Sequence, residues 1–309
     1  MFELFIIIAL ILIIGTIYQF VSVKLDKRRY RPLGEMIKID HGGFLHVVYK
    51  KIFEDRPTII LEAGNGLSSS AWMLVQPEIE KFANCLSYDR AGFGWSQQKT
   101  SSNTSLDHVN NLRNLLSKLN LPKPYIFVGH SYGGLLNLLY ASKYPNETAG
   151  IILVDAYHYD QLKIIPPPSL MTMKVLGIIL YLGIFRIFIN KLFFLPKTIP
   201  STMKKRIHAE ITAYSWIRSV RNVFFNIEKN IKPLKNIPIL NIPLAIISAG
   251  LHTGKEQKYK QRICELQKDF LKKSSKSYQV IAERSGHNIP FSEPELIVAT
   301  VKKILIQHN

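Results

Sequence analysis

Cysteine is scarce in this chain of 309 residues. Its two cysteines, Cys85 and Cys264, lie far apart, and neither belongs to a CxxC pair. Two isolated thiols favour reduced side chains over a disulfide or a metal site. We therefore expect no disulfide and no bound metal. No cofactor is expected either.

Acidic residues are also few, because 22 Asp and Glu stand against 40 Lys and Arg and leave a formal net charge of +18. This excess suits nucleic acid, an anionic membrane surface or an acidic substrate. The sequence has no zinc-finger spacing, no aromatic run typical of RNA-binding domains and no recognisable helix-turn-helix, so nucleic acid is the weakest of the three. The expected partners are a membrane lipid surface and a small-molecule acyl substrate, and the oligomeric state is open.

Charges are absent from Leu4 to Val23, and the length of this apolar run matches the ~20 residues that span a bilayer. Residues 1–23 are therefore predicted to form one transmembrane anchor, followed by a basic linker over residues 24–34. A cleaved signal peptide is the alternative, but it would start with basic residues, whereas only Glu3 precedes the run. The basic residues after the run mark the cytoplasmic side, so the catalytic domain is predicted to be cytoplasmic.

Residues 35–309 are long enough for one domain with an inserted subdomain. Short β-rich runs alternate there with helical patterns, which indicates a mostly parallel sheet covered by helices on both faces. Eight strands are predicted: Glu35 to Asp40, Phe44 to Lys50, Thr58 to Glu62, Asn84 to Asp89, Tyr125 to Gly129, Gly150 to Asp155, Leu244 to Ala249 and Ser277 to Ala282.

The interval from Gln161 to Leu240 breaks this alternation, and we interpret it as an inserted helical cap with bounds at about residues 157–240. Lys and Arg outnumber Asp and Glu in the interval by 13 to 2. Val175 to Phe185 is nearly all apolar, but Lys174 and Arg186 cut it too short for a second span. Two interpretations stay open: a helix that lies in the membrane interface, or the apolar lining of a substrate pocket under a soluble lid.

A G-x-S-x-G motif, Gly129 to Gly133, lies between a predicted strand and the helical stretch Leu135 to Tyr144. A sharp turn in this position strains the serine backbone and exposes its oxygen above the sheet, while glycines avoid collisions with neighbouring backbone. A structural serine in a glycine turn would show the same motif. The position between strand and helix nevertheless predicts that Ser131 is a nucleophile.

A serine hydroxyl needs a base that takes its proton. His287 follows the last predicted strand in Ser285-Gly286-His287 and precedes the final helix, so it is the predicted base. The other histidines fit less well. His130 lies inside the turn, His158 and His308 have no motif around them, and five are interpreted as surface or turn residues: His41, His46, His108, His208 and His252.

Two N–H donors must stabilise the charge that forms on the substrate carbonyl oxygen. The backbone amide of Tyr132, directly after Ser131, is one predicted donor. The glycine-rich loop from Glu62 to Gly66 should supply the other, and Asn65 is the predicted residue. An ordinary glycine turn is the alternative interpretation of this loop.

Four segments together resemble the α/β-hydrolase superfamily, especially its proline iminopeptidase, haloperoxidase and esterase-like branches: Leu61 to Gly64, Tyr88 to Ser96, Gly129 to Gly134 and Ser285 to His287. The resemblance begins at about Glu35 and implies an eight-stranded, mostly parallel sheet with an inserted cap. Tyr88 to Ser96 resembles a structural turn of this family. Haloalkane dehalogenases and epoxide hydrolases have a carboxylate in place of Ser131, which argues against those reactions.

The resemblance also implies a triad acid just after the seventh strand, where this chain offers no carboxylate before Glu256. Asp155, at the end of the sixth strand, holds this role in some relatives and is the predicted acid. Glu256 is the alternative acid.

These residues predict a membrane-anchored serine hydrolase that cleaves an ester or amide of an apolar acyl group through an acyl-enzyme. One alternative keeps the triad in an acyltransferase or a cofactor-free haloperoxidase or lyase. The other is a non-enzymatic membrane interaction module.

Overall fold

The computed structural model describes residues 1–40, 43–54, 56–98, 104–193, 195–196, 199–251 and 257–308. Within them, eight strands form one sheet in the order β1-β2-β4-β3-β5-β6-β7-β8. Strand β2 is antiparallel to both of its neighbours, and the other neighbouring strands are parallel. The strands are β1 (Glu35–Lys38), β2 (Phe44–Lys50), β3 (Thr58–Glu62), β4 (Asn84–Tyr88), β5 (Tyr125–His130), β6 (Thr148–Val154), β7 (Leu244–Ala249) and β8 (Ser277–Ala282).

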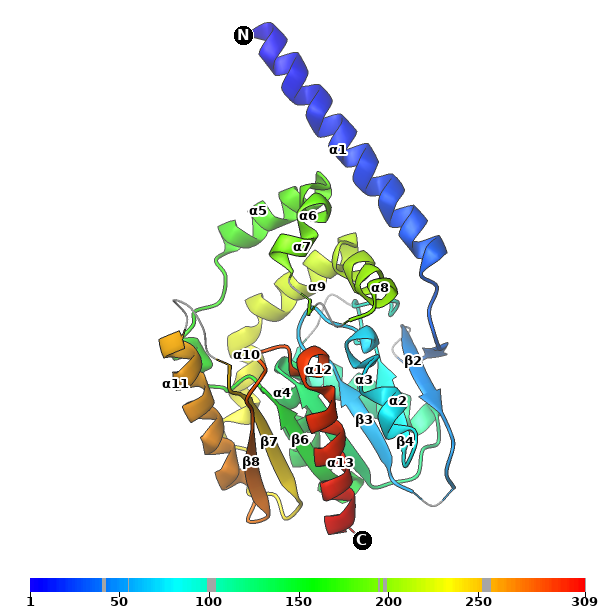
Figure 1. The fold of residues 1–309 in the computed structure, drawn as a ribbon, viewed down its shortest axis with the longest axis vertical. Helices are drawn as coiled ribbons and strands as arrows, with labels where there is room; N and C mark the ends of the chain where they lie inside the picture. Colours follow the sequence, from blue (N-terminus) through cyan, green and yellow to red (C-terminus); the bar gives the residue numbers. More distant parts are fainter. Residues whose placement is uncertain are drawn as a thin grey trace.

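The predicted sheet is confirmed, and its strand bounds differ from the predicted ones by two residues or fewer. Helices cover both faces of the sheet, and other helices form the N-terminal segment and the cap (Figure 1). They are α1 (Phe2–Arg29), α2 (Gln76–Ile79), α3 (Ser105–Lys118), α4 (Tyr132–Lys143), α5 (Leu170–Tyr181), α6 (Ile184–Ile187), α7 (Ile189–Leu192), α8 (Ser201–Ile211), α9 (Tyr214–Phe225), α10 (Ile227–Ile231), α11 (Gln257–Gln267), α12 (Ile289–Ser292) and α13 (Pro294–His308).

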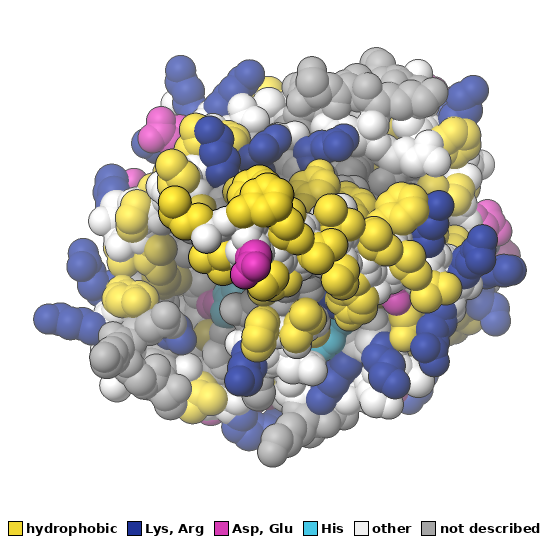
Figure 2. All heavy atoms as spheres, turned by 90° about the horizontal axis from the view of Figure 1, so that it is seen from above, with side chains coloured by type: hydrophobic (Ala, Val, Ile, Leu, Met, Phe, Trp, Pro, Cys, Tyr) yellow, Lys and Arg dark blue, Asp and Glu magenta, His cyan; other side chains and the backbone are white. Residues whose placement is uncertain are grey.

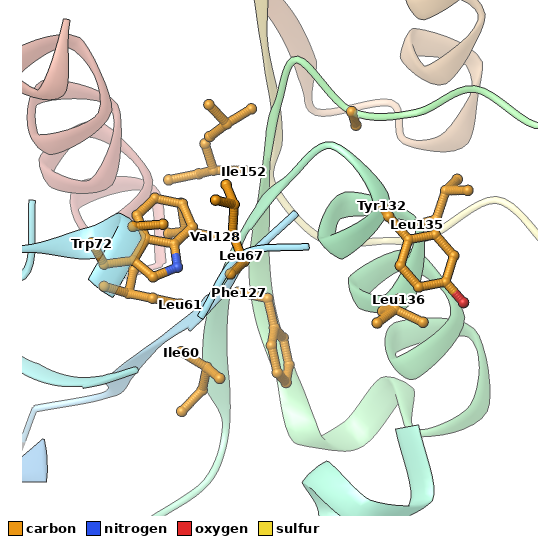
Figure 3. Close-up of a cluster of buried hydrophobic side chains, with 14 of the residues drawn as sticks. Ile60, Leu61, Leu67, Trp72, Phe127, Val128, Tyr132, Leu135, Leu136 and Ile152 are labelled. Atoms are coloured by element: carbon orange, nitrogen blue, oxygen red, sulfur yellow. The ribbon is translucent and has the colours of Figure 1, made fainter. Parts of the chain in front are cut away.

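The core lies on the central strands, whose side chains are buried on both faces, as in other parallel sheets. Figure 3 shows Phe127 and Val128 of β5 among side chains of β3 and β6, with Leu135 and Leu136 on α4. This packing fixes β5 against α4. It therefore also fixes the turn that joins them.

Helix α1 continues to Arg29, past the predicted end of the anchor and into the predicted linker. Its length and composition would allow it to cross a membrane, and a signal sequence near the N-terminus passes the same test. Figure 1 shows the N-terminal part of α1 projecting beyond α5 and α6. One long apolar helix therefore precedes the sheet.

Helices α5 to α10 fill the interval between β6 and β7 and cover one end of the sheet (Figure 1). The apolar run that begins at Val175 is not one continuous helix. It is divided between α5 and α6 at Leu182 and Gly183, and Gly183 adopts a φ of +71°. Glycine adopts this backbone conformation without steric cost, so it permits the sharp turn.

Candidate active site

Ser131 occupies the turn between β5 and α4. Its backbone has φ +53° and ψ −121°, a conformation that residues with side chains rarely adopt. Three hydrogen bonds hold the turn. The amide of Ser131 donates to the Val154 carbonyl at 3.0 Å, and its carbonyl accepts from the amides of Gly134 and Tyr157, each at 3.0 Å. The surrounding structure thus maintains a strained serine, a feature common at functional sites.

The glycines of the motif leave room for neighbouring backbone. A Cβ atom on Gly133 would collide with the carbonyl oxygens of Glu62 and Ala63, and one on Gly129 would lie 2.6 Å from the amide nitrogen of Gly134. Both contacts involve backbone atoms, which cannot move aside as a side chain can. The turn therefore requires glycine at these positions.

His287 and Asp155 are in direct contact. His287 Nδ1 lies 2.6 Å from Asp155 Oδ2, while Asp155 Oδ1 accepts hydrogen bonds from the Ala249 amide at 3.2 Å and from Gln267 Nε2 at 3.0 Å. Burial pushes the pKa of Asp155 upward. The hydrogen bond and charge interaction with His287 and the two other hydrogen bonds outweigh burial and lower this pKa. The carboxylate therefore stays ionised at neutral pH.

Ser131 and His287 line the same two cavities. Within the part of the chain that the structure describes, no hydrogen bond joins their side chains. The His287 side chain is 54% exposed, whereas the Asp155 side chain is 10% exposed. One edge of the imidazole is thus fixed by a buried carboxylate and the other faces the cavity. Catalytic hydrogen bonds often tighten only when substrate is bound.

Two cavities meet at Ser131 and His287, as judged from the described residues. The large cavity has a volume of about 540 Å³, and the small cavity about 320 Å³. The large cavity lies beneath α5 and α9 and includes Asn65 and Tyr132. Its apolar lining is Ile165, Pro166, Pro167, Pro168, Met173, Leu176, Trp216, Val220, Val223, Phe224 and Ile227.

The two expected oxyanion donors both lie beside Ser131. Tyr132 begins α4, so its amide has no acceptor within that helix. The Gly64 carbonyl accepts from Arg90 Nη2 at 2.6 Å, and the planar peptide directs the Asn65 amide the opposite way. A Cβ atom on Gly64 would lie 3.3 Å from Ser131 Cβ, so this loop runs close to the serine.

Arg90 supports this loop, a role that the sequence interpretation missed. Its guanidinium is buried, lies 2.5 Å from Glu62 Oε1 and also donates to the Ala63 carbonyl. A planar, multidentate donor can bind several oxygens at once. The motif around Asp89 had predicted only a structural turn, because the partners of Arg90 come from a separate strand.

His130 and Gln267 were also missed. His130 Nε2 lies 2.8 Å from the backbone carbonyl of His287. Burial, followed by the charge of His287, lowers the pKa of His130 to about 3, so its neutral ring can donate to that carbonyl. Gln267 donates to both Asp155 and the Ala156 carbonyl. Neither residue lies in a sequence pattern that marks such a supporting contact.

The interpretation of His46 and His108 as surface or turn residues was wrong. Both are buried, and His46 Nδ1 lies 2.9 Å from Asp89 Oδ2. The predicted alternative acid, Glu256, lies outside the described residues, as do His41 and His252.

Comparisons with known proteins agree with this fold. The family model described as alpha/beta hydrolase fold matches residues 57–204. An uncharacterised protein of Bacillus subtilis, YqjL, is 27% identical over 243 residues, which cover 78% of this chain and 80% of that protein.

Two solved structures are similar in fold. The match to a thermophilic esterase from Thermogutta terrifontis covers 89% of this chain and 99% of the esterase chain, with 18% identity and a TM-score of 0.67. The match to a membrane phospholipase A, described as a bacterial virulence factor, covers 99% of this chain and 98% of the phospholipase chain, with 17% identity and a TM-score of 0.70. The family model, these two structures, the sheet order and the turn at Ser131 together show that this chain has the α/β-hydrolase fold.

Proposed function

We propose that this protein is a membrane-anchored serine hydrolase that cleaves an ester or amide of an apolar acyl group. One observation carries the proposal: a strained Ser131 and a carboxylate-bound His287 open into the same apolar cavity. Ser131 Oγ attacks the carbonyl carbon while His287 takes its proton, and His287 then protonates the departing alcohol or amine. Water, deprotonated by His287, releases the acid and restores Ser131.

The remaining site residues stabilise the charges that form during the reaction. Asp155 orients the imidazole and stabilises the imidazolium that forms when Ser131 loses its proton. The amides of Tyr132 and Asn65 stabilise the oxyanion of each tetrahedral intermediate. The apolar lining supports an acyl chain in the large cavity, with the leaving group in the small cavity. The names of the esterase and the phospholipase A, both ester-cleaving proteins, support the same chemistry.

Labelling with a fluorophosphonate tests the nucleophile, because this probe reacts with activated serines. Wild-type protein should be labelled and should hydrolyse p-nitrophenyl esters, whereas Ser131→Ala should lose the label and about 10³-fold or more of the rate. Ser117→Ala, an exposed position on α3, is the matched control and should keep both. Label retained by Ser131→Ala would refute the assignment. Product analysis with an added alcohol separates hydrolysis from acyl transfer.

The membrane anchor is the second part of the proposal. Contacts between α1 and the cap support a helix that stays with the domain: Gln19 donates to the Thr212 carbonyl at 2.7 Å, and Asp26 pairs with Arg186 at 2.5 Å. The basic residues at the end of α1 favour a cytoplasmic domain.

Cell fractionation and external protease test this placement. The protein should remain with the membrane fraction, and protease added to intact cells should leave the domain whole. A secreted form that begins near Ser22 would instead identify a signal peptide.

A further inference from the structure

The free part of α1 is too short to cross a bilayer by itself. The large apolar side chains from Phe2 to Ile14 are exposed, and this part projects beyond the cap (Figure 1). At 1.5 Å per residue it is about 20 Å long. The hydrocarbon layer is about 30 Å thick, which matches the whole uncharged run from Leu4 to Val23, so the residues after Ile14 also lie within it when α1 spans the bilayer.

Those residues contact the cap. A Cβ atom on Gly15 would lie 2.6 Å from the Leu182 carbonyl oxygen, and one on Gly183 would lie 2.8 Å from Tyr18 Cδ1. Glycine thus lets the two backbones approach closely, as in contacts between membrane helices. If Gly15 and Tyr18 lie at hydrocarbon depth, the turn between α5 and α6 lies there too.

Polar residues fix this contact. Gln19 is fully buried, donates to the Thr212 carbonyl at 2.7 Å and accepts from Arg186 Nε at 3.1 Å. Arg186 also binds Asp26. Polar side chains at membrane depth characteristically face protein and pair with one another. The position of the cap along α1 is therefore set by directional bonds.

The surface of α5 to α7 that faces away from the sheet is apolar. We call it the apolar ridge, and it consists of the exposed side chains Leu170, Met171, Val175, Ile178, Tyr181, Ile184, Ile187 and Phe188. Figure 2, seen from the α1 end, shows a band of hydrophobic side chains in which α1 lies in front of the cap, with Lys and Arg around it. Exposed Lys174 and Lys191 adjoin the ridge. An apolar face with a basic border fits the boundary between acyl chains and headgroups.

The large cavity lies directly beneath the ridge. The same helix, α5, presents Val175 and Ile178 outward and contributes Met173 and Leu176 to the cavity lining. Ile165 and the three prolines before α5 continue that lining, and Ile165 is partly exposed. An acyl chain can therefore pass from the ridge to Ser131 along apolar side chains.

We propose that the apolar ridge lies inside the leaflet next to α1, and that the substrate is a lipid ester whose acyl chain reaches Ser131 from the bilayer beneath α5. The chemistry of this inference rests on the proposed hydrolase, and the position of the ridge rests on the proposed membrane anchor. The lipid leaflet covers the apolar ridge. The contacts of α1 place that leaflet beside it.

Depth is measured with the full chain in liposomes. A fluorophore on Ile178→Cys or Ile187→Cys should be quenched by brominated acyl chains, and one on Ile306→Cys, at the far end of α13, should not. Cys264→Ser removes the partly exposed native thiol, and Cys85 is buried. Equal quenching at all three positions, or none at Ile178 and Ile187, would overturn the position of the ridge.

Substrate access is measured with the Ile178→Asp/Ile187→Asp variant, whose positions are 60% and 63% exposed, so that the fold should persist. Hydrolysis of dioleoylphosphatidylglycerol in liposomes should fall roughly tenfold or more, because charge is excluded from hydrocarbon. Hydrolysis of water-soluble p-nitrophenyl butyrate should change less than about twofold, because the triad is untouched. Ile239→Asp/Ile306→Asp adds the same charge at positions that are 75% and 76% exposed and should leave both rates unchanged.

Equal losses with both substrates, or no loss with the lipid, would overturn lateral access. If the wild type hydrolyses butyrate but not the lipid, the lipid substrate is wrong while the proposed hydrolase stands. If it hydrolyses neither, the proposed function fails, and the quenching result still decides the position of the ridge.

Discussion

The two carboxylate oxygens of Asp155 have different partners. Oδ2 faces His287, whereas Oδ1 accepts from Gln267 and the Ala249 amide. Asp155 also has a φ of +40°, which asparagine tolerates better than most residues. Replacing one oxygen with an amide nitrogen therefore tests the proposed role toward His287 separately from the contacts with Gln267 and Ala249.

Asp155→Asn should keep the fold and lower kcat by about 10³- to 10⁴-fold, because the amide favours the wrong imidazole tautomer. Steady-state kinetics and thermal unfolding measure the two effects. Glu256→Gln is the control and should cost little. The opposite pattern would move the acid to Glu256.

Glu210 is a second carboxyl with an unusual environment, away from Ser131. It accepts hydrogen bonds from Ser68 and Ser70. Burial, followed by repulsion from Asp89, raises its pKa to about 7. Because the folded pKa exceeds the unfolded one, the carboxyl costs stability as pH rises from its ordinary value toward 7.

Glu210→Gln should remove this cost, because the amide oxygen can still accept from the serines. At pH 8 the variant should be more stable than wild type by about 2 kcal/mol. This gain is smaller than the full pKa shift implies, because the Glu210 side chain keeps some solvent contact. At pH 4 the difference should vanish. Urea unfolding at both pH values measures it, and a gain that does not depend on pH would contradict the assignment.

At the scale of elements, the loop after β3 is held from two sides. Arg90, just after β4, donates to the carbonyls of Ala63 and Gly64, and Trp216 of α9 donates to the Gly66 carbonyl at 2.8 Å. The cap and the sheet therefore meet at the proposed oxyanion donor. Changes in this support should affect kcat more than KM.

Arg90→Lys retains the charge beside Glu62 but replaces the planar fork with a single ammonium. We expect kcat to fall about 10- to 100-fold with little change in KM, as when an oxyanion donor is misplaced. The matched control is Arg113→Lys, which alters an exposed arginine paired with the buried Glu147 and should leave kcat unchanged. A change confined to KM would show that Arg90 acts on substrate binding instead.

At the scale of the whole molecule, the charge excess is concentrated near the proposed membrane face. The interval from Gln161 to Leu240 holds 13 of the 40 basic residues and 2 of the 22 acidic ones. Basic side chains near an anionic leaflet attract it by about 1 kcal/mol each, within a short screening distance. The cap should therefore bind membranes even without α1.

A chain lacking residues 1–29 should bind anionic vesicles, and added salt should weaken that binding. Vesicle sedimentation at two ionic strengths measures it. Equal binding to neutral and anionic vesicles would remove the electrostatic contribution and leave the apolar ridge as the source of affinity.

The sequence by itself determined the order of strands along the chain and the apolar N-terminal helix, because these depend on local periodicity and run length. It also singled out Ser131, since the motif, the strand and the helix are contiguous. His287 and Asp155 followed from their positions after strands. Their roles remain proposals.

Only the tertiary structure decided which distant groups meet. The contact between Asp155 and His287 spans 132 positions, Arg90 binds a loop from another strand, and Gln19 binds a cap helix. The burial of His46 depends likewise on packing against Asp89. Such contacts arise when the sheet and cap pack together, and a local pattern cannot specify a partner that is distant in the chain.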